Sequence, residues 1–557
     1  MKRRDGVRLT AGLLALALCA GVPALAEEDG ESRRREADGW SMNEWSEPWR
    51  QKASAWAVED IDRARSLGLD PFDNFVDYQA DATREEFAAL AAQLYTAVQQ
   101  DYKYMSWEAP FTDVNNSYVD MAWGLGLMQG VSDTEFAPRR SMTRLEICVL
   151  LARTLGVLEA ELEEPFAAEA AALAAGSEGT VDNWAAAGVK TVVGAGLMQG
   201  TEHGYALGET TTREQAVLLC LRTYDAVQES RRLAEEAARE SERQAKEALW
   251  QTVFTQAERE RAAELKAMKD EMDAGRYQGE SPYTQAPNLT PASFAPGALE
   301  EGFVQDGLAT INYVRAVAGL PADVRCTDEL NANAQEGALL LAASEFSHYP
   351  HRPDGMEKGL YDAGYAATSS SNIGYGHRTL SGFVLSCTDD SDAGNLDRVG
   401  HRRWLLNPDL KLVGLGYVEN MTTTKVFDHS RTPSLTPEMV CWPAQGVFPV
   451  ELADAGLGWS CTPKPGMYDL GASKGLTVTL TREGDGAVFE LDLSMDDPQA
   501  GAYCHVDTVG YGYGPAIIFR PEVEGYAHGD VYHVKIDNVK RAGGGTTSIE
   551  YTVKFFE

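Results

Sequence analysis

Apolar residues recur at helical spacing in three successive segments of the N-terminal half, and a glycine turn interrupts each segment. The pentapeptide GLMQG occupies 126–130 and recurs at 196–200, and SLGL at 66–69 is a degenerate earlier copy. Each copy is followed by a Thr-Arg pair before an apolar-periodic run, which indicates a helix N-terminus capped by threonine. The pattern predicts three repeats over 45–225, each with a helix, a glycine turn, a loop and a second helix.

Alanine and charged residues replace this pattern from about 225 to 273, with oppositely charged pairs four positions apart. This composition predicts one continuous helix, about 70 Å long at about 1.5 Å per residue. Its apolar stripe is narrow and lacks sustained heptads, which favours a helical spacer over 226–275 rather than a coiled-coil stalk. A Pro-rich linker is expected over 276–298.

An α/β pattern follows over 299–437. Phe303, Ile311 and Val314 share one helical face, and VGLGYV at 413–418 predicts a strand. The segment 438–557 alternates apolar and polar residues on both sides of the turn REGDG, which predicts a β-hairpin within a small β-sandwich of immunoglobulin-like type. This last domain is expected to support the preceding one through Trp442. The fold class is therefore multidomain α+β.

The first 26 residues have the features of a secretory signal peptide. Four Lys or Arg residues precede a short apolar run, and Ala24-Leu25-Ala26 follows it. Cys19 raises a lipoprotein alternative, which the bulky Leu18 before it disfavours. The 557-residue chain contains 49 Lys or Arg against 84 Asp or Glu, a formal net charge of −35. That balance disfavours nucleic acid as a partner, and no apolar run is long enough to predict a transmembrane segment.

Eight cysteines are spread thinly along the chain, and seven remain if the signal peptide is removed. An odd number means that at least one has no intrachain partner. Cys148 and Cys220 lie in apolar helical runs and are expected to be core residues. Any disulfide is expected among the last five, which sequence alone does not pair: Cys326, Cys387, Cys441, Cys461 and Cys504.

The repeats resemble the S-layer homology (SLH) repeat, through the glycine turn, Phe136-Ala137-Pro138 and the Thr-Arg box. The resemblance implies helical repeats that attach exported proteins to the cell wall by binding acidic, often pyruvylated, polysaccharide. The charge pattern agrees, because an arginine at a helix N-terminus presents a planar fork of donors suited to a sugar carboxylate. The expected glycan-binding residues are Arg84, Arg144 and Arg213. Alternatively, each arginine pairs with a neighbouring glutamate and only shapes the turn.

Four ordered motifs resemble the bacterial branch of the CAP superfamily (cysteine-rich secretory, antigen-5 and pathogenesis-related proteins). They are INYVRAVAGLP at 311–321, FSH at 346–348, SNIGYG at 371–376 and GHRRWLLNP at 400–408. The resemblance implies an α-β-α sandwich with a surface cleft that carries two histidines and two acidic residues, and in some members a divalent metal. By motif, His348 and His401 are the two histidines.

Two histidines in one cleft could bind a metal such as Zn²⁺ or act as base and acid, so both are candidate metal ligands and catalytic residues. Alternatively, each histidine bonds the backbone and holds the fold together. Ser371 stands where the motif has a glutamate, which weakens any catalytic reading, and Asp354 is expected as the other acid. Asn372 is expected to cap a turn. Three further motif residues are expected to pack rather than contact a ligand: Arg402, Arg403 and Trp404.

These features predict an exported protein that is attached to the cell wall or S-layer and presents its CAP domain as a binding module. The expected partners are an acidic wall polysaccharide at the SLH repeats and a small molecule, lipid or glycan at the cleft. The alternative is an extracellular hydrolase, metal-assisted or histidine-based, that uses the same cleft.

Overall fold

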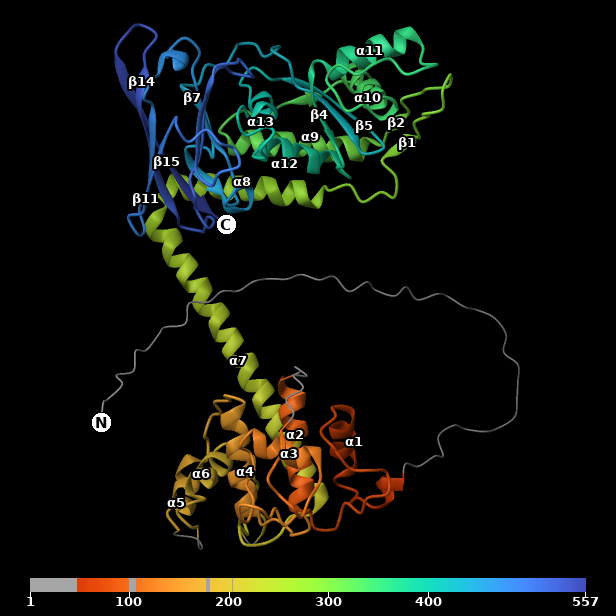
Figure 1. The fold of residues 1–557 in the computed structure, drawn as a ribbon, viewed down its shortest axis with the longest axis vertical. Coiled ribbons are helices and arrows are strands. Elements are labelled where there is room, and N and C mark those ends of the chain that lie inside the picture. The colour runs from red at the N-terminus through yellow and green to blue at the C-terminus, as the bar shows by residue number, and fades with distance from the viewer. Residues whose placement is uncertain (1–47, 100–106, 177–180, 203) are drawn as a thin grey trace, which may run out of the picture. The chain divides into compact units, whose positions relative to one another are not determined.

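The computed structural model describes residues 48–99, 107–176, 181–202 and 204–557 (Figure 1). It divides into two compact units, 1–235 and 236–557. The described residues combine helices with four sheets, as the α+β expectation requires. No described helix has both the length and the apolar character needed to cross a bilayer. The expected signal peptide, 1–26, lies outside the described residues.

The first unit contains the three predicted helix pairs and one additional helix. After a short 3-10 turn (η1, Pro48–Gln51), its helices are α1 (Val58–Ser66), α2 (Arg84–Gln99), α3 (Ser117–Gly124), α4 (Arg144–Val157), α5 (Ala167–Ala174), α6 (Ala186–Gly194) and the start of α7 (Arg213–Val253). Helices α1, α3 and α6 each end at a glycine in the left-handed region, Gly68, Gly126 and Gly196, with φ of 71°, 75° and 72°. Because glycine adopts this conformation without steric cost, the repeated glycine marks the end of each first helix.

The three Thr-Arg boxes pair with one another in a closed ring. Isolated antiparallel bridges join Thr83 to Ser141, Thr143 to Thr210, and Asp81 to Thr212. Each box therefore contacts both of the others, and the third closes back on the first. The ring fixes the N-termini of α2, α4 and α7 next to one another.

The helix expected over 225–273 is two helices rather than one. Helix α7 ends at Val253, and α8 spans Gln256–Ala274. Thr255 caps α8 through a reciprocal capping box with Glu258. This motif marks the start of a new helix within a sequence whose composition is helical throughout. The spacer predicted over 226–275 is also wrong for α8, because this helix is part of the second unit. Its residues Ala262, Leu265 and Met272 are buried in the core of that unit.

The segment expected to be a linker, 276–298, is folded onto the second unit. Strands β1 (Tyr283–Gln285) and β2 (Ala298–Leu299) pair antiparallel. Leu289 and Phe294 pack against a cluster formed by α10 residues, Met356 and Val418. Helix α8 ends before the first of these prolines, with Gly275 at its C-cap. The partly buried apolar residues of the segment hold it on the unit.

A four-stranded sheet with helices on both faces follows. Its strand order is β3 (Arg325–Cys326), β5 (Leu412–Val418), β6 (Met421–Lys425) and β4 (Ser371–Tyr375). The helices of this region are α9 (Glu301–Val317), α10 (Asp328–Ala343), α11 (Lys358–Thr368), α12 (Leu380–Asp389) and α13 (Gly400–Leu405). Gly416 of β5 lets the backbone of α10 approach, because a Cβ there would lie 2.2 Å from the carbonyl oxygen of Ala334. Helix α9 packs on the opposite face, against Leu415.

The C-terminal region forms two antiparallel-rich sheets. One has the order β11 (Val488–Asp492), β10 (Thr477–Arg482), β14 (Val531–Lys540), β15 (Thr546–Phe556) and β8 (Gly446–Pro449), and the other β12 (Tyr503–Asp507), β13 (Ala516–Arg520), β9 (Trp459–Pro463) and β7 (Met439–Trp442). Two short 3-10 turns, η2 (Val450–Leu452) and η3 (Leu470–Ala472), complete it. The predicted hairpin is confirmed, since β10 and β11 pair with Leu480 opposite Phe489.

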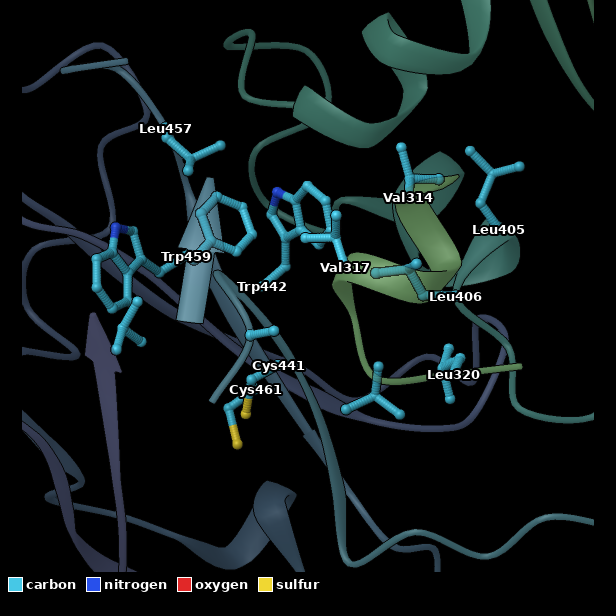
Figure 2. Close-up of a cluster of buried hydrophobic side chains, with 14 of the residues drawn as sticks. Val314, Val317, Leu320, Leu405, Leu406, Cys441, Trp442, Leu457, Trp459 and Cys461 are labelled. Carbon is cyan, nitrogen blue, oxygen red and sulfur yellow. The ribbon is translucent and has the colours of Figure 1, made fainter. Parts of the chain in front are cut away.

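The core of the C-terminal sheets is continuous with that of the α/β region. Trp442 is 1% exposed and belongs to the same buried cluster as Val314 of α9 and Leu405 of α13. Figure 2 shows Trp442 between these aliphatic side chains and Trp459. The expected packing through Trp442 is therefore confirmed, and the two regions form one folded unit.

Candidate functional site

His348 and His401 line a single cavity of about 740 Å³ in the second unit. His348 follows α10, and His401 is the second residue of α13, so the fold joins two motifs that lie 53 positions apart. The cavity falls within the usual size range of small-molecule sites, about 300 to 1,000 Å³. Its lining also includes a third histidine, His377, and two carboxylates, Asp390 and Asp392.

Asp390 fixes the ring of His401. Its Oδ1 lies 2.8 Å from Nδ1 of His401, and its Oδ2 accepts the backbone N–H of His401 at 3.0 Å. Asp390 is buried at the end of α12 in the left-handed region, with φ of 46°. The carboxylate accepts a hydrogen bond from the N–H at Nδ1, so Nε2 of His401 is the ring nitrogen that this pair does not use.

Burial alone would lower the pKa of His401. The hydrogen bond and the charge of Asp390 raise it by more than burial lowers it, so the net pKa lies above the ordinary histidine value. Since the folded-state pKa exceeds the unfolded-state pKa, protonation of this ring favours folding. Its contribution to the unfolding free energy is complete below the unfolded-state pKa and is lost as the pH rises through the folded-state pKa.

We therefore expect the His401 resonance of ¹³C-histidine-labelled protein to titrate at a pH above the ordinary histidine pKa. The variant Asp390→Asn removes the carboxylate charge, so the pKa of His401 should fall below its wild-type value in the same NMR titration. An unchanged pKa in Asp390→Asn would contradict the geometry described above.

The ring of His348 is held in the same way by the backbone. Its Nδ1 lies 2.8 Å from the carbonyl oxygen of Thr368, and the Thr368 hydroxyl donates back to the carbonyl of His348 at 3.1 Å. A carbonyl only accepts, so Nδ1 of His348 donates this hydrogen bond. Both histidines thus bond the protein through Nδ1, as the structural alternative expects, and both line the cavity.

Asn372 and Ser371 of strand β4 lie beside His401. Asn372 donates from Nδ2 to the carbonyl oxygen of His401 at 2.9 Å. Its role is structural, as expected, but it positions α13 rather than capping a turn. Ser371 is 1% exposed, and its hydroxyl has no hydrogen-bond partner within the described part of the chain.

The acidic partner of the site is Asp390, not Asp354. Asp354 is exposed and does not line the cavity. The sequence shows three carboxylates at 389–392, but which of them faces the cavity depends on where α12 ends. The sequence pattern does not specify that end.

Aromatic side chains form much of the cavity wall. Trp404 was expected only to pack; it stacks on Phe427 with ring centroids 3.8 Å apart, and both rings line the cavity. Phe346 and Tyr375 meet edge to face at 5.3 Å and are 47% and 67% exposed. The site therefore offers apolar surface beside its imidazoles.

The C-terminal region contributes Tyr511 to this wall. A Cβ at Gly400 would lie 3.2 Å from the Tyr511 ring, so the residue before His401 packs directly on it. Arg403 holds the Tyr511 loop: its guanidinium ion-pairs with Asp507, donates to the carbonyl of Val509 at 2.8 Å and lies over the Tyr511 ring. Sequence reasoning missed Tyr511, because it belongs to a domain without catalytic motifs.

His348 and His401 alone are too few ligands for a zinc site. Zinc enzymes usually supply three protein ligands, whereas the carboxylate of Asp390 is already bonded to His401. Across the described residues, no three His, Cys, Asp or Glu side chains are grouped to hold a metal ion.

The three repeat arginines are bonded within the first unit. Arg84 and Arg144 are each 7% exposed. Arg84 donates to the carbonyls of Phe136 and Gln129 at 2.8 and 2.7 Å, and Arg144 donates to those of Tyr205 and Gln199 at 2.7 Å each.

Arg213 closes the ring of boxes by bonding Glu86 at 2.8 Å and the carbonyl of Asp77 at 2.9 Å. Each arginine thus reaches from its own box into another repeat, which differs from pairing only with a glutamate of its own box. The expected contact of these arginines with a glycan stays a prediction. Two nitrogens of each guanidinium are engaged by these contacts, and burial lowers the pKa of Arg84 and of Arg144.

Two segments of the chain match known family models. Residues 110–148 match the S-layer homology domain, and residues 308–428 match CAP, the cysteine-rich secretory protein family. The chain therefore carries an SLH domain followed by a CAP domain, as the motifs predicted. An SLH domain indicates attachment to the cell surface, and a CAP domain suggests a ligand-binding module.

Among curated proteins, the chain is similar to an endoglucanase of Bacillus sp. (strain KSM-635). The two are 29% identical over 133 residues, which make up 23% of this chain and 13% of the endoglucanase. The chain thus spans a small part of that relative's length.

Proposed function

We propose that the protein is exported and held on the cell wall by its SLH repeats, which bind an acidic polysaccharide, and that its CAP cleft captures a small amphiphilic ligand. The observation that carries the proposal is the shared cavity, in which His348 and His401 each direct Nδ1 to the protein and leave Nε2 for a ligand.

The wall-binding role rests on the closed ring of Thr-Arg boxes. A guanidinium has five N–H donors in one plane, so Arg84, Arg144 and Arg213 have donors beyond the two nitrogens that the protein engages. The internal bonds would hold each fork in one orientation, and the remaining donors would meet a sugar carboxylate. Exposed Trp56 and Trp184, both 12 positions before a left-handed glycine, offer flat apolar faces for sugar rings.

We expect the full mature chain to sediment with purified cell walls and to be released by soluble pyruvylated polysaccharide. Arg144→Lys keeps the charge but lacks the fork that reaches two carbonyls, so wall binding should weaken about tenfold. The control is Arg153→Lys, an exposed position on the same helix, which should bind as wild type. Equal binding after chemical removal of the acidic sugars would contradict the proposal.

The cleft role rests on the combination of aromatic walls with imidazole nitrogens. An amphiphile such as a straight-chain fatty acid would pack its chain on Trp404, Phe427 and Tyr511. Its carboxylate would accept from the imidazolium of His401, whose raised pKa favours the protonated form. Apolar walls with a few convergent polar groups are typical of small-molecule sites.

A hydrolase is the alternative, and the Asp390–His401 pair favours it. A carboxylate on Nδ1 is the arrangement that orients a histidine for general acid–base catalysis. His348 would then be the second proton-transfer group, with or without a bound divalent metal.

A panel of fatty acids, isoprenoid alcohols and wall disaccharides separates the two functions. Incubated with the full chain and analysed by mass spectrometry, every compound should be recovered intact, and some should raise Tm. A product that forms with wild type but not with His401→Ala would instead establish the hydrolase. Zinc retained through dialysis by wild type and lost in His401→Ala would favour its metal-assisted form.

A further inference from the structure

Two cysteines lie directly opposite each other across neighbouring strands of the C-terminal region. Strands β7 and β9 pair antiparallel, with Cys441 in register with Cys461. Residues paired in this way have Cα atoms about 4.5 to 5.5 Å apart, within the 4.4 to 6.8 Å that a disulfide spans. Figure 2 shows the two side chains pointing to the same side of the strands, with their sulfur atoms adjacent.

The surroundings of this thiol pair are closed and apolar. Cys441 is 5% exposed and Cys461 is fully buried, and both belong to the core cluster that contains Trp442 and Trp459. The neighbouring Cys461 side chain and burial together raise the pKa of Cys441 well above the usual thiol value. Since the thiolate is the reactive form, these thiols exchange slowly once the domain has folded.

We propose that Cys441 and Cys461 form a disulfide bond during folding outside the cytosol. The oxidant is a small-molecule or protein disulfide. One cysteine, as thiolate, attacks that disulfide to form a mixed disulfide and release one thiol; the second cysteine then displaces the other thiol. The two cysteines lose two electrons, the oxidant gains them and is reduced to two thiols, and the two protons pass to those thiols.

Three of the other cysteines lie elsewhere or face a different residue. Cys148 and Cys220 lie in the first unit, and Cys504 of β12 pairs with Phe519 rather than with a cysteine. The proposal therefore selects one pairing among the last five cysteines and leaves an odd number of thiols. It rests on the export that the proposed function includes, but it needs no ligand at the CAP cleft, so failure of ligand binding there would leave it standing.

The test compares full-length chain refolded with oxidised glutathione and chain refolded with dithiothreitol. After alkylation under denaturing conditions, trypsin and a glutamate-specific protease cut after Glu438, Glu451 and Lys474. The oxidised sample should contain peptides 439–451 and 452–474 joined, lighter by two hydrogens than their sum, and the reduced sample should contain them separate and alkylated.

Stability gives a second readout. The bond closes a loop of about 20 residues, so the oxidised protein should melt about 5 °C or more above the reduced protein. Cys461→Ala should remove this difference, whereas Cys504→Ala, a buried control in the same sheet, should retain it. Both peptides alkylated in the oxidised sample, or Cys441 joined to another cysteine, would overturn the proposal.

Discussion

Replacing Arg402 with methionine should destabilise the second unit by about 3 kcal/mol or more. The Arg402 side chain is fully buried. Its guanidinium donates to the carbonyl of Thr388 at 2.5 Å and to that of Gly458 at 2.6 Å, and it also contacts the carbonyl of Asp389. Methionine fills much of the volume but donates nothing, so these buried carbonyls lose their partner.

Scanning calorimetry of the full chain measures this effect as a lower Tm for one transition. Thr388 and Asp389 end α12 while Gly458 precedes β9, so Arg402 joins the α/β region to the C-terminal sheets. Arg541→Met, at an exposed position of the same unit, should change the unfolding free energy by less than about 1 kcal/mol. If Arg402→Met melts like Arg541→Met, Arg402 does not connect the two regions.

Replacing His401 with alanine should weaken binding of a fatty acid such as dodecanoate by about tenfold or more. The substitution removes an imidazolium donor to the carboxylate, and hydrogen bonds to charged groups contribute about 1.5 to 3 kcal/mol. It also removes the ring that Asp390 Oδ1 bonds, while the backbone N–H of residue 401 still donates to Oδ2. Isothermal calorimetry of wild type and variant gives the ratio of the two dissociation constants.

His351→Ala is the matched control for this prediction. The His351 side chain is 89% exposed and pairs with Glu345 on the surface, outside the cavity. Its removal should leave dodecanoate affinity within about twofold of wild type. Equal losses in the two variants would show that binding does not depend on the cleft.

The sequence predicted those features that depend on short-range pattern. Left-handed glycines such as Gly126, the threonine cap at Thr143, and the hairpin of β10 and β11 all follow from residue types a few positions apart. His348 and His401 were correctly assigned to one cavity because each lies in a motif of a known family. The order of an SLH domain before a CAP domain was correct for the same reason.

Other features depend on tertiary packing that local patterns do not encode. Composition favoured a continuous helix over 225–273, but the capping box at Thr255 and the burial of Phe254 interrupt it. The carboxylate of Asp390 could not be distinguished from its acidic neighbours. Tyr511 lies 110 positions after His401, and only the packing of the C-terminal region on α13 brings it to the cavity.

The central claim is that His348 and His401 present Nε2 to one ligand in one cavity. The most direct test is a ¹³C-histidine NMR titration of the full chain with dodecanoate, with resonances assigned by single His→Gln variants. The account predicts that the signals of His348 and His401 shift together with one dissociation constant, while that of His351 stays in place. Movement of only one of the two cavity histidines, or of His351 to the same extent, would contradict it.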